Sequence, residues 1–315
     1  VISWRRARLD IALITADNKI AFRDQIPLTE EEDKVDKITS TFFNIMKPKV
    51  GDRRIMGLCI IIPGIIDAEN KRILSTVIGV GYSDPVVQRF EEAFHDYPFC
   101  LLNDTACFAY AEYVFANITE PNFAYINVSK GVGACLFANG KMLRGAGSNA
   151  TQFGHFSVDR NGPLCACGNH GCVERVVGEN ALTERAEACG IDLTRFAGRK
   201  PLYCDIGAMA EDGDAHAKEL IKDLAVDLSF AISNLITLFN PSLVVIGGMG
   251  VNLGPFFLSN IRDEVQNSGF KEFVSNTWIQ YSTLGLDSEL GGAARYYIDH
   301  YYDFFEQMQG GLYAD

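Results

Sequence analysis

Four potential metal ligands lie between residues 155 and 172. His155 precedes Cys165, Cys167 and Cys172, and the cysteines follow the spacing Cys-x-Cys-x4-Cys. Three thiolates and one imidazole form the closed tetrahedral set that structural zinc prefers, and glycines between the last two cysteines let the chain turn back around an ion. Such a set leaves no open coordination position, so the pattern predicts a structural Zn2+ and not a catalytic one. The alternative is a group of buried free thiols with a histidine nearby by chance.

A second group that could do chemistry is Asn103-Asp104, which follows an apolar stretch and precedes a helical one. A carboxylate in that place lies at the mouth of a sheet, where α/β proteins bind their ligands. Such a carboxylate could accept a proton from a ligand hydroxyl. The same pair is also a favoured helix N-cap, so the spacing alone leaves both interpretations open.

The elements that must position these residues form two rounds of strands and helices. In the first round, the apolar pattern predicts strands at 1–4, 8–16, 19–27, 54–62 and 99–102, and helices at 29–46, 86–95 and 103–116. In the second round it predicts strands at 123–128, 133–138, 141–144, 242–246 and 277–281, and helices at 179–188, 205–210, 216–239, 255–265 and 288–305. Two such rounds predict a duplicated α/β architecture with a cleft between the halves.

Composition and charge limit the class of protein. The chain has 315 residues, enough for two domains, and its 48% hydrophobic and 22% charged residues are typical of a globular protein. No stretch approaches the ~18 uninterrupted apolar residues of a membrane span, and no secretion signal is visible, so we expect no membrane partner. Nine cysteines, mostly scattered through apolar contexts, indicate a reduced, cytoplasmic location. A net charge of −12 makes the chain a poor general binder of nucleic acid.

The stretch from Gln152 to Glu174 resembles the signature of the ROK family (repressors, open reading frames and kinases acting on sugars). That signature runs Glu-x-Gly-His, then a short loop, then Cys-x-Cys-Gly-x-x-Gly-Cys-x-Glu. The second half is intact here through Glu174, whereas Gln152 stands where the family usually has glutamate. The resemblance covers nearly the whole chain and is weakest over its first thirty residues.

The resemblance implies a two-domain actin-like, ribonuclease-H-like sugar kinase fold with a structural zinc loop. Residues 1–117 with 296–315 would form a smaller N-terminal α/β domain to which the C-terminal helix crosses back. Residues 118–295 would form a larger α/β domain that carries the zinc knuckle. Family members usually form dimers or tetramers, so a homodimer or homotetramer is implied as well.

The resemblance also implies a site for a small sugar or sugar phosphate. Its expected contacts are Gly64, Asn103, Asp104, Gln152, His155 and Glu174. Asp104 matches the catalytic base of the family's kinases, and carboxylates suit sugars because they accept two hydroxyl donors at once. Gln152 keeps an acceptor oxygen but loses the charge, which implies either an altered sugar preference or a decayed site. The family's Asn-Leu-x-x-Trp sugar contact is not recognisable within residues 75–82.

Nucleotide binding separates the family's kinases from its repressors. Kinases hold ATP phosphates with an Asp-x-Gly-Gly-Thr turn, and the aligned residues here are Ser3, Arg5, Arg6 and Ala7. Arginine side chains crowd the approach of phosphate to backbone N–H groups, although their charge could also attract it. In this respect the pattern is closest to ROK-type transcriptional regulators that lack the first ATP-phosphate motif.

Two later glycine turns keep part of the family's nucleotide pattern. The second phosphate turn, usually Gly-Thr-Gly-x-Gly, is half kept through Gly131 and Gly133. Gly247-Gly248, after a buried strand, matches the adenosine-contacting turn. A glycine pair is also what a tight strand-to-helix connection needs, so this match leaves both interpretations open.

We therefore expect the sugar-sensing (effector-binding) domain of a ROK-type transcriptional regulator, without efficient kinase activity. DNA would be bound only by a winged-helix domain that precedes these residues, and the abrupt start of the chain at a strand fits a cut domain. The rival interpretation is an ATP-dependent hexose or N-acetylhexosamine kinase that uses MgATP and Asp104 as its base. A third is a decayed kinase that is kept as an oligomeric binding partner.

Overall fold

The computed structural model describes residues 1–68, 70–76, 84–146 and 150–302, and its internal contacts divide the chain into two compact units. Among the described residues, unit 1 comprises 1–118, 146 and 287–302, and unit 2 comprises 119–145 and 150–286. The division at residue 287 precedes the last helix, α11 (Ser288–Tyr301), so this helix lies wholly in unit 1. The boundary expected at residue 296 falls inside that helix.

Unit 1 is built on a five-stranded sheet with the strand order β3-β2-β1-β4-β7. The strands are β1 (Ile2–Trp4), β2 (Arg8–Ile14), β3 (Ile20–Pro27), β4 (Leu58–Ile62) and β7 (Phe99–Asn103). β1, β4 and β7 are parallel, whereas β2 and β3 add an antiparallel hairpin to one side. The carboxyl ends of the three parallel strands therefore meet at one edge of the sheet, which is where α/β folds place their ligands.

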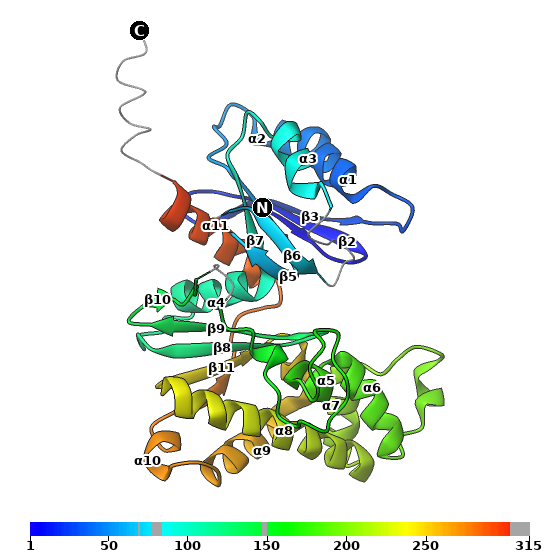
Figure 1. Ribbon diagram of the computed structural model, residues 1–315. Coiled ribbons are helices and arrows are strands. Elements are labelled where there is room, and N and C mark those ends of the chain that lie inside the picture. The colour runs from blue at the N-terminus through cyan, green and yellow to red at the C-terminus, as the bar shows by residue number, and fades with distance from the viewer. Residues whose placement is uncertain (69, 77–83, 147–149, 303–315) are drawn as a thin grey trace. The chain divides into compact units, whose positions relative to one another are not determined.

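Helices cover both faces of this sheet (Figure 1). They are α1 (Lys34–Thr41), the π-helical turn η1 (Phe42–Met46), α2 (Lys47–Val50), α3 (Val86–Ala93), α4 (Asp104–Phe115) and α11. Because side chains alternate along a strand, Ile2 and Trp4 join the apolar core with α1 and α3, whereas Ser3 between them reaches Glu289 of α11. The strand that opens the chain therefore contacts both helical layers.

Two local features of unit 1 differ from the sequence prediction. The helix expected at 29–46 begins at Lys34. The Asp33 carboxylate caps it by accepting hydrogen bonds from the backbone N–H groups of Val35 and Asp36. After Pro63 the chain forms a hairpin of β5 (Gly64–Asp67) and β6 (Arg72–Thr76), where the apolar pattern predicted no strand. Most of the segment 75–82, and the expected end of the last helix at 305, lie outside the described residues.

Unit 2 repeats the sheet of unit 1, with the strand order β10-β9-β8-β11-β12. The strands are β8 (Phe123–Val128), β9 (Val132–Ala138), β10 (Lys141–Met142), β11 (Leu243–Gly247) and β12 (Trp278–Tyr281). β8, β11 and β12 are parallel, and β9 and β10 extend the sheet antiparallel. In both units, an antiparallel meander of three strands is followed by two parallel strands. This repetition confirms the predicted duplicated α/β architecture.

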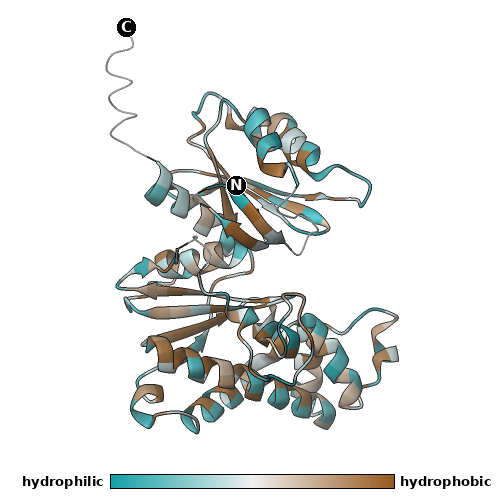
Figure 2. Ribbon diagram, viewed as in Figure 1, coloured by the Kyte–Doolittle hydropathy of each residue, from teal (hydrophilic) through white to brown (hydrophobic). Residues whose placement is uncertain are grey.

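The helices of unit 2 pack on one face of this sheet (Figure 1). They are α5 (Val173–Val177), α6 (Glu179–Ala188), α7 (Tyr203–Glu211), α8 (Ala215–Phe239), α9 (Gly254–Gln266) and α10 (Lys271–Val274), with the 3-10 turns η2 (Phe153–His155), η3 (Leu193–Phe196) and η4 (Met249–Leu253). The apolar colour of the strands in Figure 2 reflects their burial, since every residue of β8 and β11 is buried.

Among the described residues, no helix is both long and apolar enough to cross a membrane.

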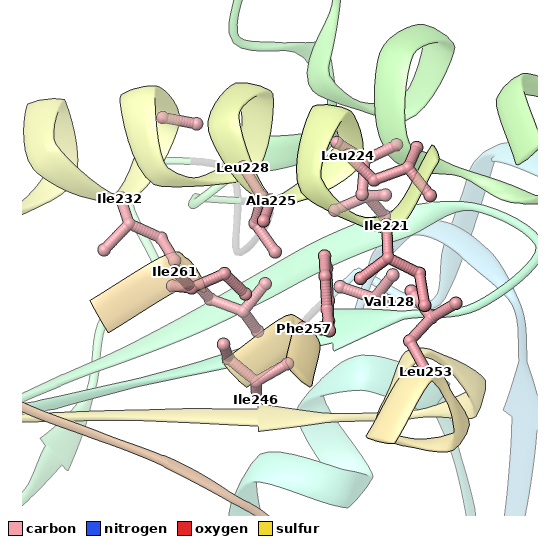
Figure 3. Packing of buried hydrophobic residues seen from close by; sticks show 14 of the residues in the cluster. Val128, Ile221, Leu224, Ala225, Leu228, Ile232, Ile246, Leu253, Phe257 and Ile261 are labelled. Atoms are coloured by element: carbon pink, nitrogen blue, oxygen red, sulfur yellow. The ribbon is translucent and has the colours of Figure 1, made fainter. Parts of the chain in front are cut away.

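The core of unit 2 centres on the long helix α8. Leu224, Leu228 and Ile232 recur on its inner face and meet Phe257 and Ile261 of α9 (Figure 3). All five are fully buried, and each such side chain contributes about 1.5–3 kcal/mol relative to exposure. This packing fixes α8 and α9 against the sheet and so holds the loops at its edge.

The close crossing of α4 and α11 in unit 1 generates a stability prediction. A Cβ atom on Gly292 would lie 2.0 Å from the carbonyl oxygen of Cys107, so Gly292→Ala must push the two helices apart. We expect destabilisation of about 1–3 kcal/mol, measured by urea unfolding. Gly291→Ala is the matched control, since its Cβ would meet only the Phe115 ring, at 3.2 Å, and a ring can shift. Equal stabilities of the two variants would contradict the prediction.

Candidate functional site

The structure brings the four predicted metal ligands together in unit 2. One ligand atom from each of His155, Cys165, Cys167 and Cys172 lies within 4.8 Å of all the others. The Cys167 and Cys172 sulfurs are 3.6 Å apart, and the Cys165 sulfur is 3.6 Å from His155 Nδ1. Tetrahedral zinc with bonds of about 2.3 Å to sulfur and 2.0–2.1 Å to nitrogen has edges of about 3.6–3.8 Å. The donor set and its spacing therefore fit a closed metal site.

The backbone of the cysteine loop holds this geometry. The Cys165 N–H donates to Asn169 O at 2.8 Å, and the Gly168 N–H donates back to Cys165 O at 2.9 Å. Gly168 and Gly171 have φ values of +90° and +58°, which glycine adopts without strain. A Cβ on Gly171 would also lie 1.8 Å from Asp159 O, so only glycine fits that turn. A loop shaped this closely around four ligand atoms argues against a chance group of thiols.

Asn103 and Asp104 begin helix α4 in unit 1. Asn103 Oδ1 accepts from the Ala106 N–H at 3.0 Å and is the N-cap, while its Nδ2 donates to Gly64 O at 2.6 Å. Asp104 Oδ1 accepts from the Thr105 N–H at 2.8 Å and from Asn103 Nδ2 at 3.2 Å. Capping is thus the role of Asn103, and Asp104 is the acid beside it at the carboxyl end of β7.

The pKa of Asp104 suits a proton acceptor. Burial raises the pKa of this carboxyl above its ordinary value, and the positive charge of Arg5 opposes the rise. A base whose pKa lies closer to neutral takes a hydroxyl proton more readily than an ordinary aspartate does.

The turn between β1 and β2 carries an ion pair that the sequence did not reveal. The guanidinium of Arg5 donates through Nη2 to Glu289 Oε1, and the Ser3 hydroxyl donates to the same oxygen at 2.9 Å. Glu289, in the first turn of α11, is only 1% exposed. Burial raises its pKa to about 7, although Arg5 and Ser3 oppose the rise. In the sequence, Glu289 is an ordinary acid at the start of a predicted helix, where negative charge is favoured. No local pattern pairs it with Arg5.

The second phosphate turn lies beside the signature residues of unit 2. Glu174 Oε2 accepts from the Val132 N–H at 3.3 Å, and a Cβ on Gly131 would lie 2.5 Å from that same oxygen. A Cβ on Gly154, which precedes His155, would lie 1.8 Å from Val132 O. Both halves of the signature therefore converge on the turn that contains Gly131 and leads into Gly133 at the start of β9.

Gly247 is the last residue of β11, and Gly248 after it packs against the same turn. Gly248 has φ +80°, and a Cβ there would lie 2.2 Å from Asn127 Oδ1 and 2.5 Å from Ser129 Oγ. The Met249 N–H donates to Ser129 Oγ at 3.1 Å, which ties the two turns together. The tight strand-to-helix connection by itself accounts for glycine at position 248.

The predicted residues thus fall into separate local groups. Unit 1 joins Gly64 with Asn103 and Asp104, and unit 2 joins Glu174 with Gly131 and the metal ligands with each other. Gln152 lies immediately before the 3-10 turn that carries His155. The sequence missed the polar partners Glu289 and Ser129, because their contacts join segments far apart in the chain.

Comparisons with known proteins place this architecture in a family. A family model described as ROK family matches residues 6–299. The chain is 26% identical over 250 residues to the xylose repressor of Bacillus subtilis, an alignment that covers 79% of this chain and 62% of that repressor. The chain therefore spans less than two thirds of the length of that relative.

Solved structures include both regulators and kinases with this fold. A ROK family transcriptional regulator described as a homologue of the Escherichia coli Mlc protein has a TM-score of 0.79 at 24% identity, covering 93% of this chain and 76% of that chain. A ROK family glucokinase from Streptomyces griseus, solved with glucose and AMPPNP, has a TM-score of 0.75 at 21% identity, covering 94% of this chain and 97% of that chain. The predicted two-domain sugar kinase-like fold is confirmed, and both functional classes share it.

The cysteine loop generates a prediction about metal content. Cys167→Ser removes one sulfur ligand, so we expect elemental analysis of the purified chain to fall from ~1 zinc per chain to nearly none, with lower thermal stability. Cys204→Ser, an exposed cysteine on α7, is the matched control and should keep the metal. Equal zinc content in the two variants would refute the metal site.

The buried Glu289 generates a prediction about pH. Its pKa of about 7 in the folded chain exceeds the ordinary 4.5, so between these values the folded state holds more protons than the unfolded state. The contribution of Glu289 to stability is therefore complete below pH 4.5 and is lost as the pH rises through 7. The difference corresponds to a loss of roughly 3 kcal/mol in the free energy of unfolding.

Urea unfolding at about pH 5 and about pH 8 measures this loss. Glu289→Gln should remove that part of the pH dependence, whereas Glu31→Gln, at an exposed position of unit 1, should retain it. The interpretation fails if wild type and Glu289→Gln show the same dependence.

Proposed function

This chain belongs to the ROK family, and on that premise we propose that it is the sugar-sensing domain of a ROK-type transcriptional regulator without efficient kinase activity. The observation that carries the proposal is the first phosphate turn. Arg5 stands where the family's kinases have a glycine, and its guanidinium is ion-paired with the buried Glu289. Ser3, in the position of the aspartate that helps to place Mg2+, donates its hydroxyl to the same carboxylate.

The physical consequence is a turn that no longer cradles phosphate. A phosphate cradle needs backbone N–H groups that an anion can approach closely, which glycine permits. The Arg5 side chain adds bulk at that turn, and its charge is already neutralised by Glu289. An ATP phosphate would have to compete with a buried carboxylate for the guanidinium.

The sugar contacts remain those that the signature implies. In unit 1 the Asp104 carboxylate would accept a sugar hydroxyl, and the Asn103 cap fixes the start of the helix that carries it. In unit 2 the proposed contacts are Gln152, His155 and Glu174. Glu174 Oε1 has no hydrogen-bond partner among the described residues, so this oxygen can accept a sugar hydroxyl.

The metal set has a structural role in this proposal. Zn2+ held by His155 and the three cysteines would keep the loop closed and so hold His155 and Glu174 in place. DNA would be contacted by a winged-helix domain outside these residues, and the assembly would be a homodimer or homotetramer.

A sugar kinase is the second candidate, favoured by Asp104. Its raised pKa suits a general base. Gly131, Gly133 and the Gly247-Gly248 turn keep parts of a nucleotide site. In that case MgATP would be the cofactor, and Asp104→Asn should abolish transfer of phosphate to the sugar.

A thermal-shift titration with MgATP and no sugar decides between the two candidates. A ligand at one hundred times its dissociation constant stabilises a protein by about 2.7 kcal/mol, so binding at millimolar MgATP is easily detected. We expect no shift for this chain, with a ROK family glucokinase as the positive control in the same plate. A clear Mg2+-dependent shift would overturn the sensor proposal in favour of the kinase.

A panel of free sugars and sugar phosphates follows in the same assay. We expect at least one compound to raise the melting temperature of the wild type, and both Asp104→Asn and Glu174→Gln to lose that shift. Asp212→Asn, an exposed aspartate of unit 2, is the control and should respond as the wild type does. If Asp104→Asn and Glu174→Gln retain the full response, neither carboxylate contacts the sugar.

A further inference from the structure

Two buried carboxylates from different elements pair with one guanidinium in unit 1. Asp10 comes from β2 and Glu289 from the start of α11, and both meet Arg5 in the turn after β1. Asp104, at the start of α4, is a third acid on which the charge of Arg5 acts. Asp10 is 5% exposed and Glu289 is 1% exposed. Buried carboxylates are costly unless cations face them, so the composition of this cluster requires an explanation.

The contacts of Arg5 neutralise the cluster only in part. Arg5 Nη2 is bonded to Glu289 Oε1, and Arg5 Nε lies 3.5 Å from Asp10 Oδ2. Arg8 reaches the other Asp10 oxygen from the exposed side, at 2.9 Å. Glu289 Oε2 and Arg5 Nε are buried and have no hydrogen-bond partner among the described residues. One inner cation therefore pairs with two buried carboxylates, and Glu289 Oε2 still lacks a donor.

The Arg5 charge acts on all three acids. It pairs directly with Asp10 and Glu289, and it opposes the effect of burial on the pKa of Asp104. Carboxylate and hydroxyl oxygens, here including Ser3 Oγ, are the ligands that Mg2+ and Mn2+ prefer in proteins. The cluster has the donor chemistry of a hard-cation site with a side chain in the place of the ion.

We propose that this cluster is a divalent-cation site whose resident cation is the guanidinium of Arg5. The side chain supplies the positive charge that a bound ion would supply, and it holds the β1–β2 turn against α11 without any ligand. The inference deepens the proposed function, because a site that carries its own cation has no vacancy for the Mg2+ that ATP brings. It also means that removing Arg5 exposes a metal site that the wild type conceals.

The test is Mn2+ binding to the full chain without nucleotide, measured by electron paramagnetic resonance. Arg5→Gln removes the charge but keeps a polar side chain, and it should bind one Mn2+ at least about tenfold more tightly than the wild type. Arg5→Lys retains the cation and should bind Mn2+ no better than the wild type. Arg8→Ala is the matched control, since Arg8 contacts Asp10 only from the exposed side.

A second substitution assigns the new Mn2+ to this cluster. The double variant Arg5→Gln with Glu289→Gln should lose the gained binding, whereas a metal bound at the cysteine loop would be unaffected. The proposal is overturned if Arg5→Gln gains no Mn2+, or if the wild type already binds Mn2+ through Glu289. If Arg5→Gln folds poorly in buffer without added divalent cation, millimolar Mg2+ should restore its melting temperature, and failure to do so also overturns the proposal.

The outcome is separable from that of the sensor proposal. An Mg2+-dependent ATP shift in the wild type would end the sensor proposal, whereas the role of Arg5 is judged by Mn2+ alone. The opposite combination is also informative. If MgATP does not shift the melting temperature of the wild type and Arg5→Gln gains no Mn2+, the sensor proposal stands and Arg5 is rejected as the resident cation.

Discussion

The ion pair between Arg5 and Glu289 joins the two ends of unit 1. The two residues are 284 positions apart, one in the first turn of the sheet and the other in the first turn of the last helix. A carboxylate as buried as Glu289 is costly unless a cation faces it, so α11 docks where its acid meets the guanidinium. Because α11 packs along α4, the same pair also fixes the surroundings of Asp104, the first residue of α4. The candidate site of unit 1 therefore depends on a contact that closes the unit.

In unit 2, different interactions hold the segment that carries the candidate site residues. This signature segment contains little regular structure, and short turns and isolated bridges hold it beside the four potential metal ligands. The loop is anchored where Glu174 and Gly154 meet Val132 at the edge of the sheet. A metal ion bound by the four ligands would therefore act on the same segment that the sheet edge anchors.

A regulator and a kinase can share this scaffold because binding a sugar and transferring phosphate use different parts of it. Hydroxyl recognition needs acceptor oxygens such as those of Asp104 and Glu174, which this chain retains. Transfer also needs a nucleotide whose phosphates approach the backbone closely and carry Mg2+. In this chain the first phosphate turn is tied to Glu289 by Arg5 and Ser3, which is why we propose that the chain keeps sugar recognition and has lost the part that serves ATP.

The sequence by itself determined the features whose information is local. The cysteine spacing with its glycines predicted the ligand set, the Asn103-Asp104 pair predicted the helix cap, and the two rounds of apolar strands predicted the duplicated α/β fold. Only the tertiary structure decided what Arg5 does, because its partner lies at the far end of the chain and no local pattern distinguishes Glu289 from an ordinary helix-start acid. The β5–β6 hairpin was missed for a related reason, since cross-strand pairing and not local propensity stabilises such short strands.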